Sequence, residues 1–196
     1  MSQLDWFIKR SFDIIVSALG LAVLWPLILV SWIIARKDTE ASGFFKQERV
    51  GKGGHLFKVV KLRTMRAVGG TTITAANDPR ITKWGGRFRR WKLDELPQLW
   101  NVLIGQMSFV GPRPDVPGYL DRLEGDDKRL LELRPGITGP ATLKYRNEEE
   151  LLLGQTDPEA FNNGVIWPDK VRINLEYLDT WSFKRDLNYI IKTVRR

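Results

Sequence analysis

The sequence predicts an α/β protein that is mostly helical, with a small β-hairpin or sheet, and that is attached to a membrane by its N-terminus. Three observations carry this prediction. They are an uncharged apolar run over 14–35, a strand-turn-strand pattern over 44–65 and helical apolar periodicity over 168–194. A chain of 196 residues can bury one sizeable core. We therefore expect a single folded domain with a membrane attachment.

The apolar run is long enough to cross a bilayer, because about 22 residues at roughly 1.5 Å each match a hydrocarbon core of about 30 Å. Pro26 lies at its midpoint, after Trp25. Basic residues flank both ends, namely Lys9, Arg10, Arg36 and Lys37. The positive-inside rule places both ends in the cytoplasm. Two alternatives remain open: a helix broken near Trp25 and Pro26 that enters and leaves by the same leaflet, and an ordinary spanning helix with a tolerated proline.

The segment after the apolar run is predicted to form a hairpin. Residues 45–50 and 56–62 carry strand-forming residues, and the glycine-rich stretch 51–54 supplies the turn. Lys61 and Arg63, at the end of the second strand, are candidates for phosphate contact. Residues 83–90 alternate basic and aromatic side chains, which is typical of a helix lying on a membrane surface. The prolines of 111–114 and 134–140 predict two rigid loops, each carrying one arginine.

The most informative motif is the acidic pair Asp94 and Glu95, which lies within a basic stretch and just before Pro97. We predict a helix over 97–103, whose positive end favours ionised carboxylates nearby. An ionised Asp can attack phosphorus, and a neighbouring carboxylate can hold Mg²⁺. The alternative is structural, with the pair capping the helix and forming ion pairs with Arg89 and Arg90.

Charge and composition narrow the function classes. The net charge of +8 and the pI near 9.8 imply an anionic partner, which could be a nucleic acid, phospholipid headgroups or a phosphorylated substrate. The chain has no cysteine, which excludes disulfides and thiolate metal sites. His55 is the only histidine, which rules out a multi-histidine metal site and disfavours a Ser-His-Asp triad.

Together these motifs resemble the bacterial sugar transferase family, small membrane-associated phosphoglycosyl transferases that act on a polyprenyl phosphate. The resemblance is carried in order by the runs 61–65, 93–103, 108–114 and 134–139. It implies a monotopic membrane protein with a kinked, re-entrant helix hairpin over 1–38. Residues 39–196 would form a catalytic domain with interfacial amphipathic helices, at the cytoplasmic face of the bacterial inner membrane. It implies transfer of a phosphosugar from a UDP-sugar to polyprenyl phosphate, with release of UMP.

The resemblance also implies roles for individual residues. Asp94 would be the nucleophile and Glu95 would support Mg²⁺, the cofactor, which both carboxylates would contact. Substrate contacts would come from Lys61, Arg63, Arg89, Pro112, Arg113, Pro114 and Arg134. The chain departs from the family pattern at Trp25, where members often have a serine before the kink proline. It departs again at Asn174, where many members have an acidic residue, and the sequence leaves open whether Asn174, Asp169 or Glu176 has a role at the metal.

Two rival functions belong to other classes. A non-enzymatic membrane-anchored scaffold or regulator would use the basic surface to hold partners, but it would not need the acidic pair. A nucleic-acid-binding protein would explain the charge but not the apolar run, so we expect no nucleic acid partner. An anionic phospholipid membrane is the expected surface for the basic residues. The identity of the sugar, the polyprenol length, the glycan pathway and the existence of a homodimer stay open.

Overall fold

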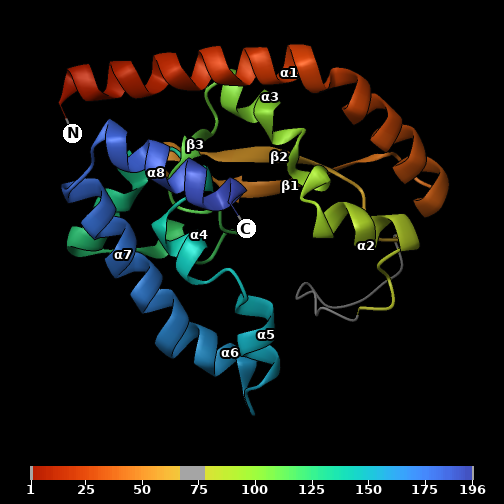
Figure 1. Ribbon diagram of the computed structural model, residues 1–196. Helices are drawn as coiled ribbons and strands as arrows, with labels where there is room; N and C mark the ends of the chain where they lie inside the picture. The colour runs from red at the N-terminus through yellow and green to blue at the C-terminus, as the bar shows by residue number, and fades with distance from the viewer. Residues whose placement is uncertain (1, 67–77, 196) are drawn as a thin grey trace.

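The computed structural model describes residues 2–66 and 78–195, and Figure 1 shows the arrangement of its elements. The helices are α1 (Gln3–Thr39), α2 (Lys83–Arg90), α3 (Gln98–Leu103), α4 (Pro140–Lys144), α5 (Glu148–Leu153), α6 (Pro158–Phe161), α7 (Trp167–Asp179) and α8 (Phe183–Val194). The strands are β1 (Phe44–Val50), β2 (Leu56–Leu62), β3 (Ser108–Val110) and β4 (Gly136–Thr138). The fold is therefore mostly helical with small sheets, as the sequence predicts.

Helix α1 is a single helix of 37 residues. Ser2 begins it with a capping box, in which the Ser2 hydroxyl accepts from the Asp5 amide and the Asp5 carboxylate accepts from the Ser2 amide. Glu40, in the left-handed conformation, ends it. Pro26 lies inside the helix, which continues through it as one element, so the chain keeps a helical path at Trp25 and Pro26. The helix bends in its second half, the half that contains Pro26 (Figure 1), which agrees with the predicted kinked helix.

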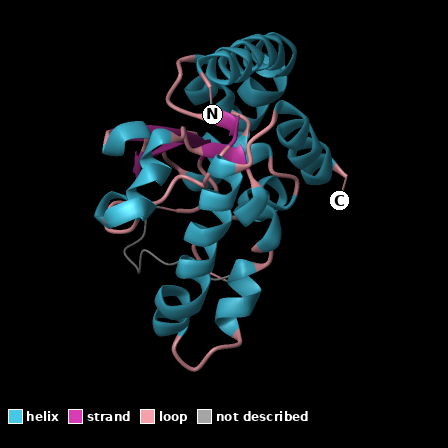
Figure 2. Ribbon diagram, turned by 90° about the vertical axis from the view of Figure 1, so that its left-hand side faces the viewer, coloured by secondary structure: helices cyan, strands magenta, loops and turns pink. Residues whose placement is uncertain are grey.

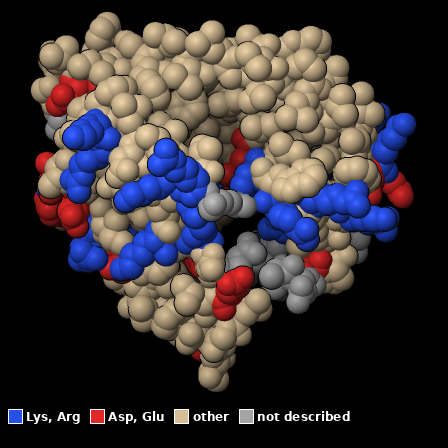
Figure 3. Space-filling model, viewed as in Figure 1, with Lys and Arg blue, Asp and Glu red and all other residues tan. Residues whose placement is uncertain are grey.

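The faces of α1 are reversed relative to those of a helix in a water-soluble protein. Its buried residues are mostly polar or small: Lys9, Asp13, Ser17, Ser31, Ala35 and Thr39. Its exposed residues include many large apolar ones: Leu4, Phe7, Ile8, Ile14, Ile15, Leu19, Val23, Trp25, Leu27, Leu29, Val30 and Ile33. Figure 3 shows the result as an uncharged band along the top of the molecule, with lysine and arginine side chains gathered on both sides below it. Such a band is suited to lipid, because exposing so much apolar surface to water is unfavourable.

Both halves of α1 pack on the same domain. The first half contacts α3, α8 and β3, and Gly20 lets α3 approach closely, since a Cβ there would lie 3.2 Å from a Leu99 methyl carbon. The second half contacts α2 and the β1–β2 hairpin, where Ala35, Leu62 and Phe88 form an apolar cluster. The Trp84 amide also donates to the Asp38 carboxylate at 3.0 Å. A helix held at both ends by one domain supports membrane attachment from one side. The same-leaflet path itself stays a prediction.

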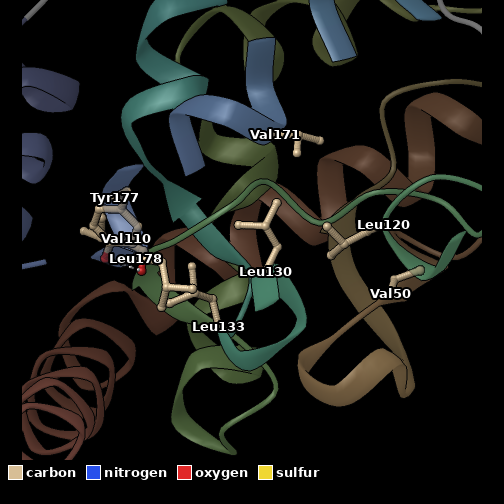
Figure 4. Packing of buried hydrophobic residues seen from close by; sticks show 8 residues of the cluster. All are labelled: Val50, Val110, Leu120, Leu130, Leu133, Val171, Tyr177 and Leu178. Atoms are coloured by element: carbon tan, nitrogen blue, oxygen red, sulfur yellow. Dashed lines mark hydrogen bonds between the residues drawn. The ribbon is translucent and has the colours of Figure 1, made fainter. Parts of the chain in front are cut away.

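Two short sheets support the centre of the domain. Strands β1 and β2 pair antiparallel, from Phe44 with Leu62 to Val50 with Leu56, which confirms the predicted hairpin. Strand β3 pairs in parallel with β4, so the loop predicted at 134–140 contains a strand. The main core cluster, drawn in Figure 4, joins these strands to α7 through Val50, Val110, Leu120, Leu130, Leu133, Val171, Tyr177 and Leu178. Helices α5 and α6 extend from the end of the domain opposite to α1 (Figures 1 and 2).

Candidate active site

The acidic pair lies in a tight turn between α2 and α3. Lys92 takes a left-handed conformation with φ of 57° and so turns the chain away from α2. Asp94 and Glu95 then form a short 3₁₀ segment, η2 (Leu93–Glu95). Pro97 caps α3, which confirms the predicted helix at this position. The pair is thus held by rigid elements on both sides, and neither carboxylate is buried in the apolar core.

Glu95 is held between two cations that come from separate parts of the chain. Its Oε1 atom lies 3.5 Å from Lys61 Nζ, on β2, and 3.4 Å from Arg113 Nη2, in the loop after β3. Burial acts to raise the pKa of Glu95, but the charges of Arg113, Lys61 and Lys92 outweigh it and lower the pKa to about 2. Glu95 is therefore ionised throughout the physiological range and fixes both cations in place.

Asp94 has the opposite electrostatic environment. Burial and the negative charge of Glu95 raise its pKa, against the charges of Lys61, Lys92 and Arg89. Its Oδ1 atom is buried and has no hydrogen-bond partner within the described part of the chain. A buried oxygen without a partner costs free energy in the folded state, so a structure that retains one has a use for it. Two adjacent carboxylates with opposite pKa shifts are suited to different roles.

The basic residues around the pair form a small hollow. Its lining comes from Arg49, Val59, Lys61, Gln98, Arg113, Pro114 and Gly136, and its volume is about 10 Å³. This space admits about one water molecule. Burial and the charge of Arg113 lower the pKa of Lys61, because the two cations lie close together here. A hollow lined by three cations is the local chemistry that binds phosphate oxygens.

Two residues at this site were missed by the sequence reasoning. Arg49 Nη1 donates to the Pro114 carbonyl oxygen at 3.0 Å and so holds the loop that carries Arg113. Asp115 follows that loop, and burial raises its pKa to about 6, against the charges of Lys170, Arg49 and Arg113. In the sequence Arg49 is one polar residue of a predicted strand, and only the fold brings this strand next to residues 112–114. No local pattern in the sequence indicates this contact.

The remaining candidates lie in different places. Arg89 is near enough for its charge to act on Asp94. Pro112 fixes the loop, since its carbonyl oxygen accepts from the Gly136 amide at 2.7 Å.

Two predicted substrate contacts lie away from the acidic pair. Arg63 donates from Nε to the Ser42 carbonyl oxygen at 2.8 Å. Arg134 donates to the Gly105 carbonyl oxygen at 2.9 Å, beyond the far end of α3. The structure therefore brings Lys61, Arg89 and the 112–114 loop to the acidic pair, but not Arg63 or Arg134.

The site residues fit a hard cation such as Mg²⁺ only with help from a substrate. Within residues 2–66 and 78–195 no cluster of three or more His, Cys, Asp or Glu side chains could hold a metal ion. Asp94 and Glu95 are two adjacent carboxylates, and the free Oδ1 atom of Asp94 is a suitable ligand. Mg²⁺ commonly binds one or two carboxylates together with substrate phosphates. The donor set therefore fits, provided that phosphate oxygens complete it.

The acidic residues of α7 are engaged in other contacts. Asp169 contacts Lys144 at 2.5 Å and Arg172 at 2.7 Å, and it also accepts from the Tyr145 hydroxyl. Hydrogen bonds from these three residues hold the pKa of Asp169 far below its usual range. Glu176 pairs with Arg172 at 3.8 Å, and Asn174 is buried on the same helix. The ion pairs of Asp169 and Glu176 are thus made with residues other than Asp94 and Glu95, and Asn174 is buried on α7.

An acidic pair next to Lys61 and Arg113, on a domain that carries an apolar outer helix, is the arrangement expected of a membrane-associated enzyme that acts on phosphate-bearing substrates. The family model described as bacterial sugar transferase matches residues 4–196. The chain belongs to this family.

Similar proteins span most of the chain. Exopolysaccharide production protein PSS of Rhizobium leguminosarum bv. phaseoli is 37% identical over 201 residues, which cover 97% of this chain and 95% of that protein. A UDP-glucose:undecaprenyl-phosphate glucose-1-phosphate transferase of Caulobacter vibrioides is 33% identical over 192 residues, covering 95% of this chain and 68% of that protein. A putative undecaprenyl-phosphate N-acetylgalactosaminyl 1-phosphate transferase of Bacillus subtilis is 42% identical over 137 residues, covering 63% of this chain and 76% of that protein.

Proposed function

We propose that the protein transfers a sugar phosphate from a UDP-sugar to polyprenyl phosphate at the cytoplasmic face of the bacterial inner membrane. The observation that carries this proposal is the acidic pair, in which Glu95 contacts Lys61 and Arg113 while Asp94, within reach of the charge of Arg89, has the opposite pKa shift. The names of the Caulobacter and Bacillus relatives point to the same chemistry, because both refer to undecaprenyl phosphate. The product would be the first lipid-linked unit in polysaccharide synthesis.

The first half-reaction uses Asp94 as the nucleophile. An ionised carboxylate oxygen of Asp94 attacks the phosphorus that carries the sugar, and the bond from this phosphorus to the UMP oxygen breaks. UMP leaves, and the sugar phosphate stays on Asp94 as an acyl phosphate. Burial of Asp94 means that little water has to be displaced before the attack. Lys61 and Arg113 stabilise the charge that spreads over the phosphate oxygens.

The second half-reaction regenerates the enzyme. An oxygen of polyprenyl phosphate attacks the same phosphorus, and the bond to the Asp94 oxygen breaks. Glu95 remains ionised in both steps because its pKa is about 2, and it keeps Lys61 and Arg113 oriented toward the phosphate. Mg²⁺, held by Asp94, Glu95 and the substrate oxygens, would supply further neutralisation of phosphate charge. A carboxylate nucleophile needs no histidine to activate it, which suits a chain with one histidine.

A donor-only experiment tests this mechanism. The purified protein is mixed with a UDP-sugar and no acceptor, and we expect about one equivalent of UMP per active protein, as covalent catalysis in two steps requires. Mass spectrometry should then find the sugar phosphate on the peptide that contains Asp94, and polyprenyl phosphate should remove it. Full turnover with both substrates, but no UMP and no adduct with donor alone, would show that no covalent intermediate forms.

A further inference from the structure

A wide, open hollow lies at the end of α1 and in the turn that leads to β1. Its volume is about 570 Å³, and it is lined by Trp32, Ile33, Arg36, Lys37, Glu40, Ala41 and Ser42. Binding sites for small ligands usually have volumes of about 300–1,000 Å³. Most of the surface area that lines it is apolar, although the lining includes charged residues. The hollow lies on the membrane-facing helix, so it differs in kind from the small polar hollow that Arg49, Lys61 and Arg113 line.

The hollow is adjacent to the acidic pair through packed side chains. Trp32 packs against the apolar cluster of Ala35, Leu62 and Phe88, and so does Leu93, the residue just before Asp94. Leu62 follows Lys61, which contacts Glu95. One apolar cluster therefore contacts both a residue that lines the hollow and the residue that precedes Asp94.

Positive charge surrounds the hollow. Arg36 and Lys37 line it, and Arg63 reaches it through the hydrogen bond to the Ser42 carbonyl oxygen. This carbonyl is neutral, so the bond leaves the charge of Arg63 in place. Arg36 lies over the Trp32 ring at 5.6 Å, and this contact also leaves its charge in place. Glu40 is the one acidic residue of the lining. Arg36, Lys37 and the nearby Arg63 outnumber the acidic residues of this turn, Glu40 and Asp38, which favours an anionic ligand.

We propose that this hollow binds the acceptor lipid, polyprenyl phosphate, with its first isoprene units against Trp32 and Ile33 and its phosphate toward Arg36, Lys37 and Arg63. The inference rests on the proposed function, because it assigns a place to the second substrate. The hollow would be the place where the acceptor docks: Arg63 would help to hold its phosphate there, before this phosphate moves to the phosphorus on Asp94 for the second half-reaction. An amphiphile with one anionic head fits a lining that is apolar on the lipid side and cationic at its edge.

Filling the hollow tests the proposal. Ala41→Trp places a large side chain in it, and Val30→Trp is the matched control, since Val30 is exposed on α1 and does not line the hollow. We expect Ala41→Trp to raise the KM for polyprenyl phosphate about tenfold, which corresponds to about 1.4 kcal/mol. The amount of UMP released by donor alone should stay unchanged, because the first half-reaction does not use the acceptor.

Direct binding makes the test independent of turnover. The protein in phosphatidylcholine nanodiscs is titrated with polyprenyl phosphate, with polyprenol and with phosphatidylglycerol, without any UDP-sugar. We expect polyprenyl phosphate to bind at least about tenfold more tightly than the other two lipids, and Ala41→Trp to remove this preference. Equal binding of phosphatidylglycerol, or equal effects of Ala41→Trp and Val30→Trp, would overturn the acceptor site. If donor alone releases no UMP, the covalent mechanism is wrong. The lipid titration still tests the acceptor site in that case, because it needs no turnover.

Discussion

Lys9 Nζ lies 2.5 Å from Asp186 Oδ2, and this ion pair joins the first helix of the protein to the last. Both side chains are almost fully buried. Asp186 also accepts hydrogen bonds from the Tyr177 hydroxyl at 2.7 Å and from Trp181 Nε1 at 3.0 Å. The contacts of Lys9 therefore attach the membrane-facing helix to the core of the domain through a network of buried polar groups.

Removing one partner of this pair should destabilise the protein strongly. Lys9→Met leaves a buried carboxylate without its cation, and we expect a loss of about 3–5 kcal/mol in the free energy of unfolding. The double variant Lys9→Met with Asp186→Asn should recover much of this loss, because neither charge then remains unpaired. Denaturant unfolding in detergent measures both, and Lys128→Met, an exposed position, is the control. Additive losses in the double variant would contradict the coupling.

Asp94→Asn should abolish transfer and also stabilise the fold. Loss of a nucleophile typically lowers the rate by a factor on the order of 10³ or more. Burial and Glu95 raise the pKa of Asp94, so its ionised form is less favourable in the folded state than in the unfolded state. A neutral Asn removes this cost, so Tm should rise, and the gain should grow as pH increases through the pKa of Asp in the unfolded chain. UMP release and thermal unfolding check the two effects, with Asp127→Asn as the control.

Arg113→Gln should change the pH dependence of activity. Arg113 is the largest of the influences that lower the pKa of Glu95, so its removal should let that pKa rise from about 2 toward the ordinary value. The acid limb of kcat/KM should then move to higher pH. Stability should respond in the same sense, because a lowered carboxylate pKa contributes stability above pH 4.5 that is lost as pH falls toward 2. An acid limb at the same pH in both proteins would contradict the role of Arg113.

Gly20→Leu should disturb the site from a distance. A Cβ at this position would lie 3.2 Å from a Leu99 methyl carbon, so a larger side chain must push α1 away from α3. We expect a loss of about 1–3 kcal/mol in the free energy of unfolding, as for other overpacked contacts. Turnover should fall as well, since α3 directly follows the acidic pair. Ala22→Leu, at an exposed position on the same helix, should change neither quantity.

Cysteine labelling tests the path of α1 in the membrane. The chain has no cysteine, so single substitutions give clean probes. Gln3→Cys lies at the start of α1 and Ser42→Cys in the turn that follows its end, and both should react with a membrane-impermeant maleimide in inside-out vesicles. Neither should react in intact cells from which the outer membrane has been removed. Labelling of the two positions from opposite sides would show that α1 spans the bilayer and would disprove the same-leaflet path.

The sequence predicted the elements whose signals are local. The β1–β2 hairpin followed from its glycine-rich turn, α3 from Pro97, and α7 and α8 from their apolar periodicity. The acidic pair was also found from a local pattern of charge. Strand β4 was missed because three residues carry no periodic signal and its partner β3 lies far away in the chain.

The environment of the site could not be predicted in the same way. The contacts of Glu95 with Lys61 and Arg113 come from segments more than fifteen residues away on either side, and only the fold brings them together. Arg63 and Lys61 look equivalent in the sequence, but their side chains go to different places, because Arg63 lies just beyond the end of β2. The packing of both halves of α1 on one domain could not be predicted either, because a window of apolar residues does not reveal contacts with distant segments.

The reversed faces of α1 affect any attempt to prepare the catalytic domain alone. Without residues 1–38, Asp186 would lose its lysine, and the carbonyl oxygens of Val102 and Leu103 would lose the Arg10 guanidinium that now binds them at 2.7 Å. The truncated protein would expose polar cavities where the helix had been, rather than an ordinary soluble surface. Extraction with the helix in place, in detergent or in native lipid discs, is therefore the route to active material.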